Sequence, residues 1–247
     1  MGTPCAAPLL SNRERGMRRL VLFDIDGTLL TADGAGKRAL HDALVDVFGT
    51  TGPIDSYSFA GRTDPQIVHA LMSAAGLPRD EIDRRLADLW AHYIANLRRE
   101  VERTAVEALP GIRELLRRVE EAGGDVVMGL LTGNIEEGAR IKVDAAGLAW
   151  ERFRVGAFGS DHADRPELPA VAMRRARERT GVEYAGKEIV ILGDTPFDIT
   201  CGAHLGVRTI AVATGRHTAE DLASHAPDHL FPDFRDTDAA WQAIVGE

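Results

Sequence analysis

Apolar residues along this chain follow two patterns, which meet near residue 108. After an apolar run over 19–23, the apolar positions of residues 34–104 recur every three or four residues, which is the spacing of amphipathic helices. Beyond residue 108, short runs that are apolar along their whole length alternate with helical segments. Such runs are typical of strands buried on both faces of a parallel sheet. The pattern therefore predicts an α/β fold with a helical insertion after its first strand.

The insertion is predicted to contain three helices and no strand. They cover 35–48, 65–75 and 79–103; the first ends at Gly49, and either Thr63 or Asp64 caps the second, whose first residue is Pro65. Gly34 and Gly36 lie at the start of this block, where the chain leaves the core, and we expect them to act as a hinge.

The second part of the chain is predicted to form a doubly wound parallel sheet. Its strands and helices alternate, with strands over 126–131, 153–158, 188–192 and 208–213, and helices over 110–123, 136–146, 167–180, 197–205 and 236–245. We assign residues 17–33 and 105–247 to the α/β core, 34–104 to the insertion and 1–16 to a mobile tail.

Charge and composition exclude several classes of protein. The 247 residues carry a formal net charge of -9, which argues against a nucleic-acid surface. No apolar run is long enough to span a membrane, and residues 1–16 do not resemble a secretory signal. Cys5 and Cys201 do not suggest a disulfide framework. We expect a cytoplasmic protein that is a monomer or a homodimer.

Three predicted strands end in polar residues, and parallel strands present these ends at one edge of the sheet. Asp24 and Asp26 follow the first strand and share one side, with Ile25 facing away. A hard cation such as Mg²⁺ relieves the repulsion between two such carboxylates. The alternative is an ordinary Asp-Gly turn.

The other two strand ends carry complementary groups. Thr132 offers a hydroxyl, and Gly133 and Asn134 offer backbone N–H groups at a helix N-terminus, where phosphate binds readily. Asn134 either contacts substrate or caps the helix over 136–146. Asp194 and Asp198 add carboxylates after the strand over 188–192.

Three segments resemble motifs of one family in their order along the chain. DIDGT at 24–28, LLTGN at 130–134 and GDTPFDI at 193–199 are similar to the first, second and fourth motifs of the haloacid dehalogenase superfamily. The layout resembles its phosphoglycolate phosphatase-like members. The resemblance implies a Rossmann-like core and identifies the helical insertion as a mobile cap.

The resemblance also implies roles for individual residues. Asp24 is the expected nucleophile and Asp26 the expected general acid and base. Mg²⁺ would be held by the Asp24 carboxylate, the Asp26 backbone carbonyl and Asp194, with Asp198 as a ligand or a support. Thr132 and Gly133 would bind the phosphoryl oxygens. An Asp at position 26 favours phosphate esters over carbon–halogen bonds.

Two assignments stay open in the sequence. Family members usually place a Lys before a Pro ahead of the fourth motif; here Arg165 stands at that place, and Lys142 competes for the role of facing Asp24. Arg62 either binds a second anionic group of the substrate or pairs locally with Asp64.

The resemblance predicts a Mg²⁺-dependent phosphatase that forms an aspartyl-phosphate on Asp24. Its substrate would be a small phosphorylated metabolite, with phosphoglycolate suggested by the family. The alternatives are a phosphomutase similar to β-phosphoglucomutase and a catalytically silent binding protein on the same fold. We expect neither a nucleic-acid nor a membrane partner.

Overall fold

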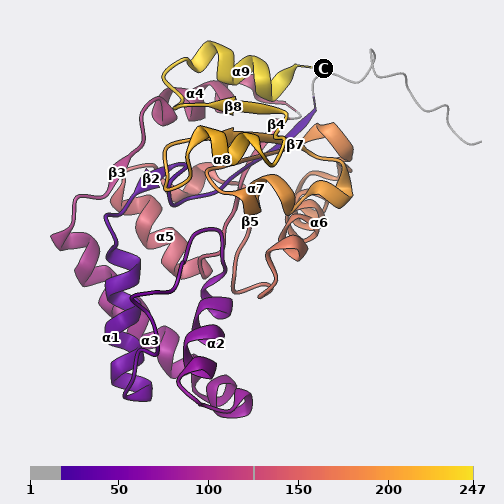
Figure 1. Cartoon of the computed structure of the whole chain (residues 1–247). Helices are drawn as coiled ribbons and strands as arrows, with labels where there is room; N and C mark the ends of the chain where they lie inside the picture. Colours follow the sequence, from indigo (N-terminus) through magenta and orange to yellow (C-terminus); the bar gives the residue numbers. More distant parts are fainter. Residues whose placement is uncertain (1–17, 125, 247) are drawn as a thin grey trace, which may run out of the picture.

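A parallel six-stranded sheet forms the centre of the molecule (Figure 1). The computed structural model describes residues 18–124 and 126–246, so the tail predicted over 1–16 lies outside the described residues. In spatial order the strands are β5 (Val155–Ala157), β4 (Val126–Leu131), β1 (Arg19–Phe23), β6 (Ile189–Gly193), β7 (Arg208–Val212) and β8 (His229–Phe231). Every neighbouring pair is parallel, which confirms the predicted α/β fold.

Both faces of the sheet are buried because successive side chains of β1 point in opposite directions. Val21 and Phe23 belong to a core cluster that includes residues of α4, α5 and α9, whereas Leu20 and Leu22 pack in a second cluster with α6. The covering helices are α4 (Ile112–Ala122), α5 (Glu136–Ala145), α6 (Leu168–Thr180) and α9 (Thr237–Val245). Burial on both faces explains why the strands read as continuous apolar runs.

Three helices form the insertion after the first strand. They are α1 (Ala35–Phe48), α2 (Asp64–Ala74) and α3 (Arg79–Arg103), and their bounds lie within one residue of those predicted. Figure 1 shows them together at the end of the molecule opposite α9. Leu44 of α1 and Leu89 of α3 are both fully buried in the larger core cluster. Among the described helices, none is both long and apolar enough to cross a membrane.

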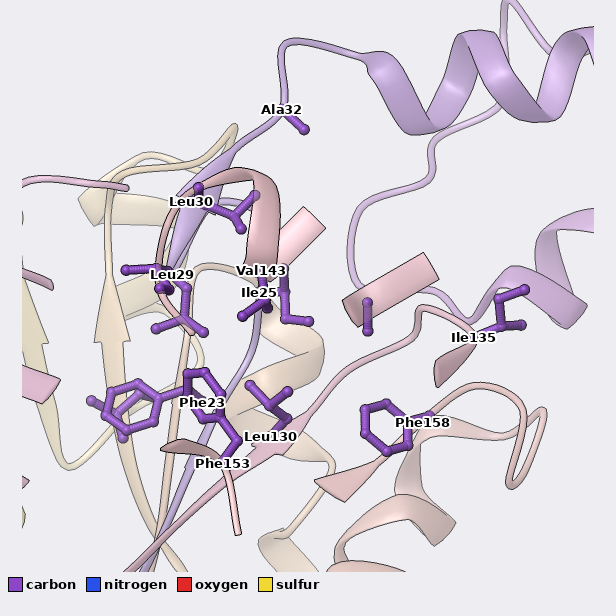
Figure 2. Close-up of a cluster of buried hydrophobic side chains, with 14 of the residues drawn as sticks. Phe23, Ile25, Leu29, Leu30, Ala32, Leu130, Ile135, Val143, Phe153 and Phe158 are labelled. Carbon is purple, nitrogen blue, oxygen red and sulfur yellow. The ribbon is translucent and has the colours of Figure 1, made fainter. Parts of the chain in front are cut away.

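The chain enters and leaves this helical block through two short strands that pair with each other. β2 (Leu30–Thr31) and β3 (Glu107–Ala108) are antiparallel, with Leu30 opposite Ala108. Figure 2 shows buried Ile25, Leu29 and Leu30 extending the core beyond β1 towards Ala32, where the chain departs for α1. The sheet and the helical block therefore share one continuous core cluster.

Several elements are shorter than the sequence predicts, among them the segments predicted over 197–205 and 153–158. The helix predicted over 197–205 is α7 (Pro196–Thr200), and a separate 3₁₀ turn covers 203–205. Gly202 separates them, and a Cβ at this position would overlap the side chains of Val207 and Ile191. Of the strand predicted over 153–158, only the part that forms β5 pairs with a neighbouring strand. The remaining short helix is α8 (Ala219–Ala223).

Candidate active site

A cavity of about 440 Å³ lies between the carboxyl ends of the central strands and the helices α1–α3. Its wall includes all but one of the site residues predicted from the sequence. These are Asp24, Asp26, Arg62, Thr132, Gly133, Asn134, Lys142, Arg165 and Asp194. The exception, Asp198, is 2% exposed and contacts Arg165. The fold thus brings the three predicted strand ends together at one place, as parallel topology requires.

Arg165 lies against the carboxylate of Asp24. Its Nη2 is 3.1 Å from Asp24 Oδ1, and the same nitrogen donates to Asp198 Oδ1. All three side chains are buried. Burial alone lowers the pKa of Arg165, but Asp198 and Asp24 raise it above its ordinary value. The guanidinium therefore stays charged between the two acids.

Three carboxylates gather around this position. Asp24, Asp194 and Asp198 each place an oxygen within 4.8 Å of the others. Burial, together with the neighbouring carboxylates, raises the pKa of Asp24 to about 7 and that of Asp194 to about 9. The single positive charge of Arg165 therefore does not balance the negative charge of three carboxylates. A hard divalent cation fits a group made of carboxylate oxygens alone.

The three carboxylates differ in how free their oxygens are. Asp198 Oδ1 accepts from Arg165, while its Oδ2 accepts from the backbone N–H of Thr195 at 3.0 Å and from its hydroxyl at 2.6 Å. Asp194 accepts only a long 3.4 Å bond from Thr28 among the described residues. Asp24 and Asp194 are therefore better placed to hold a cation, with Asp198 supporting Arg165.

Asp26 faces a different set of partners. Lys142 Nζ donates to Asp26 Oδ1 at 2.9 Å and to Oδ2 at 2.7 Å, and Asn134 Nδ2 donates to Oδ2 at 2.8 Å. The Asp26 side chain is 44% exposed and lines the cavity. The two cations left open by the sequence thus have separate partners: Arg165 contacts Asp24, and Lys142 contacts Asp26.

Asn134 does not cap the following helix, so the capping alternative is wrong. The residue at the N-cap of α5 is Ile135, and its backbone N–H donates to Asp64 Oδ2 at 2.9 Å. Asp64 belongs to α2, so an acid from the helical block occupies the N-terminus of a core helix. The Asn134 amide is free to donate to Thr132 Oγ1 at 2.8 Å as well as to Asp26.

Residues 61–66, which we call the docking segment, hold the helical block against the core. The backbone N–H of Asp64 donates to the Gly133 carbonyl at 2.7 Å, and Thr63 Oγ1 donates to the Ala163 carbonyl at 2.6 Å. A Cβ on Gly133 would overlap the carbonyl of Arg62. Glycine at position 133 therefore permits this close approach.

Arg62 does not pair with Asp64 in the described part of the chain, so that alternative is wrong. Its guanidinium lies over the rings of Tyr57 and Phe197, at 5.4 and 5.7 Å from their centroids. Stacking between two rings fixes the guanidinium at the cavity wall and leaves its N–H groups directed elsewhere than at a carboxylate. Asp64 is engaged with the backbone of Ile135 instead.

Several residues that line the cavity cannot be recognised as site residues from the sequence. Lys37, Tyr57, Phe59 and Tyr93 also line the cavity. Tyr93 occupies a helical apolar position and is 2% exposed, so its pattern is that of a core residue. Burial, with Asp64 and Asp26 nearby, raises its pKa well above the ordinary value. Only the packing of α3 against α1 and α5 brings its ring into the site.

Buried carboxylates beside an arginine, at the carboxyl edge of a Rossmann-like sheet and next to a helix N-terminus, form a site suited to phosphoryl transfer. The chain belongs to the haloacid dehalogenase-like hydrolases, whose family model matches residues 21–203.

Curated relatives carry phosphatase names. A probable phosphatase, IndB of Dickeya dadantii (strain 3937), is 26% identical over 240 residues, covering 93% of this chain and 96% of that protein. A phosphoglycolate phosphatase of Pseudomonas fluorescens (strain Pf0-1) is 22% identical over 221 residues, covering 88% of this chain and 77% of that protein. These names support phosphatase activity.

Solved structures share the fold. A predicted phosphoglycolate phosphatase from Haemophilus somnus 129PT has a TM-score of 0.67 at 19% identity, covering 92% of this chain and 99% of that one. A hydrolase from Pseudomonas syringae has a TM-score of 0.69 at 18% identity, covering 93% and 100%. The sheet with its inserted helices is therefore a recurring architecture.

Proposed function

We propose that the protein is a Mg²⁺-dependent phosphatase that hydrolyses a small phosphorylated metabolite through an aspartyl-phosphate on Asp24. The observation that carries this proposal is that two neighbouring acids have different surroundings. Asp24 lies in the buried acidic cluster against Arg165, whereas Asp26 faces the cavity and is held by Lys142. One acid is thus placed to attack phosphorus and the other to move a proton.

In the first step Asp24 attacks phosphorus and the ester oxygen leaves with a proton from Asp26. Arg165 restrains the rotation of the Asp24 carboxylate through Oδ1. In the second step Asp26 takes a proton from water, which attacks the aspartyl-phosphate and releases inorganic phosphate. Asp26 ends each cycle in the protonation state in which it began.

The phosphoryl group would bind at the turn between β4 and α5. The Thr132 side chain is 1% exposed and lines the cavity, next to the backbone of Gly133 and Asn134. Donors at a helix N-terminus favour an anion. Asp24, Asp194 and the Asp26 backbone carbonyl would hold Mg²⁺, which would supply positive charge to offset the charge of the phosphoryl oxygens.

The substrate would contact the helical block through Arg62. Its guanidinium, fixed by Tyr57 and Phe197, is suited to a second anionic group, and phosphoglycolate carries one. The name of the Pseudomonas fluorescens relative supports the same choice. We further propose that the enzyme works in the cytoplasm, as a monomer or a homodimer.

Phosphate release from a panel of phosphate esters, with and without Mg²⁺, tests the proposal. We expect release that requires Mg²⁺ and that Asp24→Asn abolishes. Transfer that requires a sugar bisphosphate and releases no phosphate would identify a mutase instead. A purified, folded protein that is inert towards the whole panel would support a binding protein.

A further inference from the structure

Lys142 is a buried lysine whose ammonium is fully engaged. It is 5% exposed, and an ammonium offers three donors. The acceptors are Asp26 Oδ1, Asp26 Oδ2 and Asn134 Oδ1, all between 2.7 and 2.9 Å from Nζ. No donor of this lysine is left for a phosphoryl oxygen in this arrangement.

Asn134 closes a ring of hydrogen bonds with the same carboxylate. Its Oδ1 accepts from Lys142, and its Nδ2 donates to Asp26 Oδ2 at 2.8 Å. The Asp26 carboxylate therefore accepts three hydrogen bonds from two side chains of β4–α5. Three donors fix both the position and the rotation of a carboxylate that would otherwise turn freely in the cavity.

The helical block encloses the ammonium from the other side. A Cβ on Gly36, the second residue of α1, would lie 3.2 Å from Lys142 Nζ, and the same point is 3.6 Å from the Tyr93 hydroxyl. Glycine is otherwise less favourable than alanine in a helix. The space needed by Lys142 accounts for glycine at this position.

We propose that Lys142 is a positioning residue for Asp26, acting together with Asn134 and enclosed by Gly36. It orients the Asp26 carboxylate towards the leaving-group side of the cavity and does not bind the phosphoryl group itself. The proposal rests on the proposed function, because it takes Asp26 as the acid. A displacement of about 1 Å in a reacting group can cost about 10²-fold in rate.

Two substrates separate this role from the alternatives. An alkyl phosphate needs a proton on its leaving oxygen, whereas p-nitrophenolate leaves without one. We expect Lys142→Met to lower kcat/KM by about 10²-fold for the alkyl ester and by much less for p-nitrophenyl phosphate. The inhibition constant of inorganic phosphate should stay within about threefold of wild type, because a uniform loss of binding is not expected.

A double-mutant cycle tests whether Lys142 acts through Asp26. In an Asp26→Asn background, Lys142→Met should have little further effect on the alkyl ester, because coupled residues are not additive. Gly36→Ala, which crowds the ammonium without removing it, should show the same preference between substrates. Arg140→Met, on an exposed residue of the same helix, is the matched control.

The outcomes separate this inference from the proposed function. Equal losses for both substrates, a loss of phosphate inhibition parallel to kcat/KM, or an undiminished effect in the Asp26→Asn background would overturn the role of Lys142. If the wild-type protein hydrolyses neither ester, the proposed function fails instead. Gly36→Ala retains every polar side chain, so it decides the matter if Lys142→Met does not fold.

Discussion

At the scale of single residues, the site depends on one guanidinium shared by two buried acids. Arg165 contacts Asp24 and Asp198, and its Nη1 also donates to the carbonyl of Gly61 at 3.4 Å. A planar guanidinium can face several acceptors at fixed angles, which a lysine ammonium cannot reproduce. The arginine thus replaces the usual lysine with a group that also contacts the docking segment.

Removing this guanidinium should disable the nucleophile. We expect Arg165→Met to lower kcat by about 10²–10³-fold, comparable with the loss of one preorganised hydrogen-bond donor from an oxyanion hole. Arg165→Lys should recover only part of it, because one ammonium cannot span both carboxylates. Steady-state kinetics with Arg174→Met, on an exposed arginine of α6, as the control would check this. Full activity of Arg165→Lys would contradict the geometric argument.

The raised pKa values of the acidic cluster predict a pH-dependent response to Mg²⁺. Without a cation, the folded protein keeps protons on Asp24 and Asp194 up to about pH 7 and 9, whereas the unfolded chain loses them near pH 4. Stability without Mg²⁺ therefore falls as pH rises through this window. The proposed Mg²⁺ would have to displace these protons, so its affinity should increase with pH.

Thermal unfolding with and without Mg²⁺ at pH 6 and pH 8 measures this effect. The increase in Tm caused by Mg²⁺ should be larger at pH 8, and calorimetry in two buffers should detect proton release on binding. An Asp194→Asn variant should lose most of the difference. Equal Tm shifts at both pH values would show that the cluster binds no cation in competition with protons.

At the scale of elements, the docking segment joins α2 to α5. Asp64 is the first residue of α2, yet its carboxylate serves the N-terminus of α5. Burial raises the pKa of this carboxyl to about 6. The backbone N–H of Ile135, the N-cap residue of α5, therefore depends on the helical block being seated, whereas the backbone N–H of Glu136 donates to Ser160 Oγ in the core at 3.2 Å.

Loss of the Asp64 carboxylate should loosen this contact. We expect Asp64→Ala to cost about 1 kcal/mol in the free energy of unfolding, the usual effect of removing a helix cap. Asp64→Asn keeps an acceptor oxygen and should cost less. Chemical denaturation of both variants, with Asp80→Ala at the exposed start of α3 as the control, provides the comparison. Equal costs for Asn and Ala at position 64 would count against a capping role.

The sequence predicts long elements well and contacts between elements poorly. The helices over 35–48 and 79–103 carry many apolar positions at one period, so their bounds emerge directly. The partners of Arg165 and Lys142 depend on which side chains the sheet brings within reach, and Lys142 and Asp26 are 116 residues apart. β2 and β3 have two residues each, which is too few for any periodic signal.

At the scale of the whole molecule, the parallel sheet carries the reacting acids and the helical block carries Arg62, Tyr93 and the docking segment. We propose that residues 34–104 move together as a cap that admits the substrate and then seats against Gly133 and Ile135. The contacts that would break are the hydrogen bonds of Asp64 to these two residues. The hydrogen bond of Thr63 to Ala163 would break as well, and the core cluster that the helical block shares with the sheet would open, whereas the second cluster, packed with α6, would stay intact.

Hydrogen exchange can follow this movement. The amides of Asp64 and Ile135 donate across the contact, so they should exchange faster than those of β1 and β4. Mg²⁺ together with inorganic phosphate should slow both amides by favouring the seated arrangement. Protection that does not respond to these ligands would show that the helical block stays fixed.

The pairing of β2 with β3 has a consequence for how such proteins diversify. Because Leu30 lies opposite Ala108, the strand that leads into the helical block is paired directly with the strand that leads out of it. A segment whose ends already adjoin can be exchanged for another of different length without altering the distance that the core must bridge. Under the proposed function, substrate preference can thus change independently of the chemistry, when the helical block between β2 and β3 is replaced and the sheet with its acids is kept.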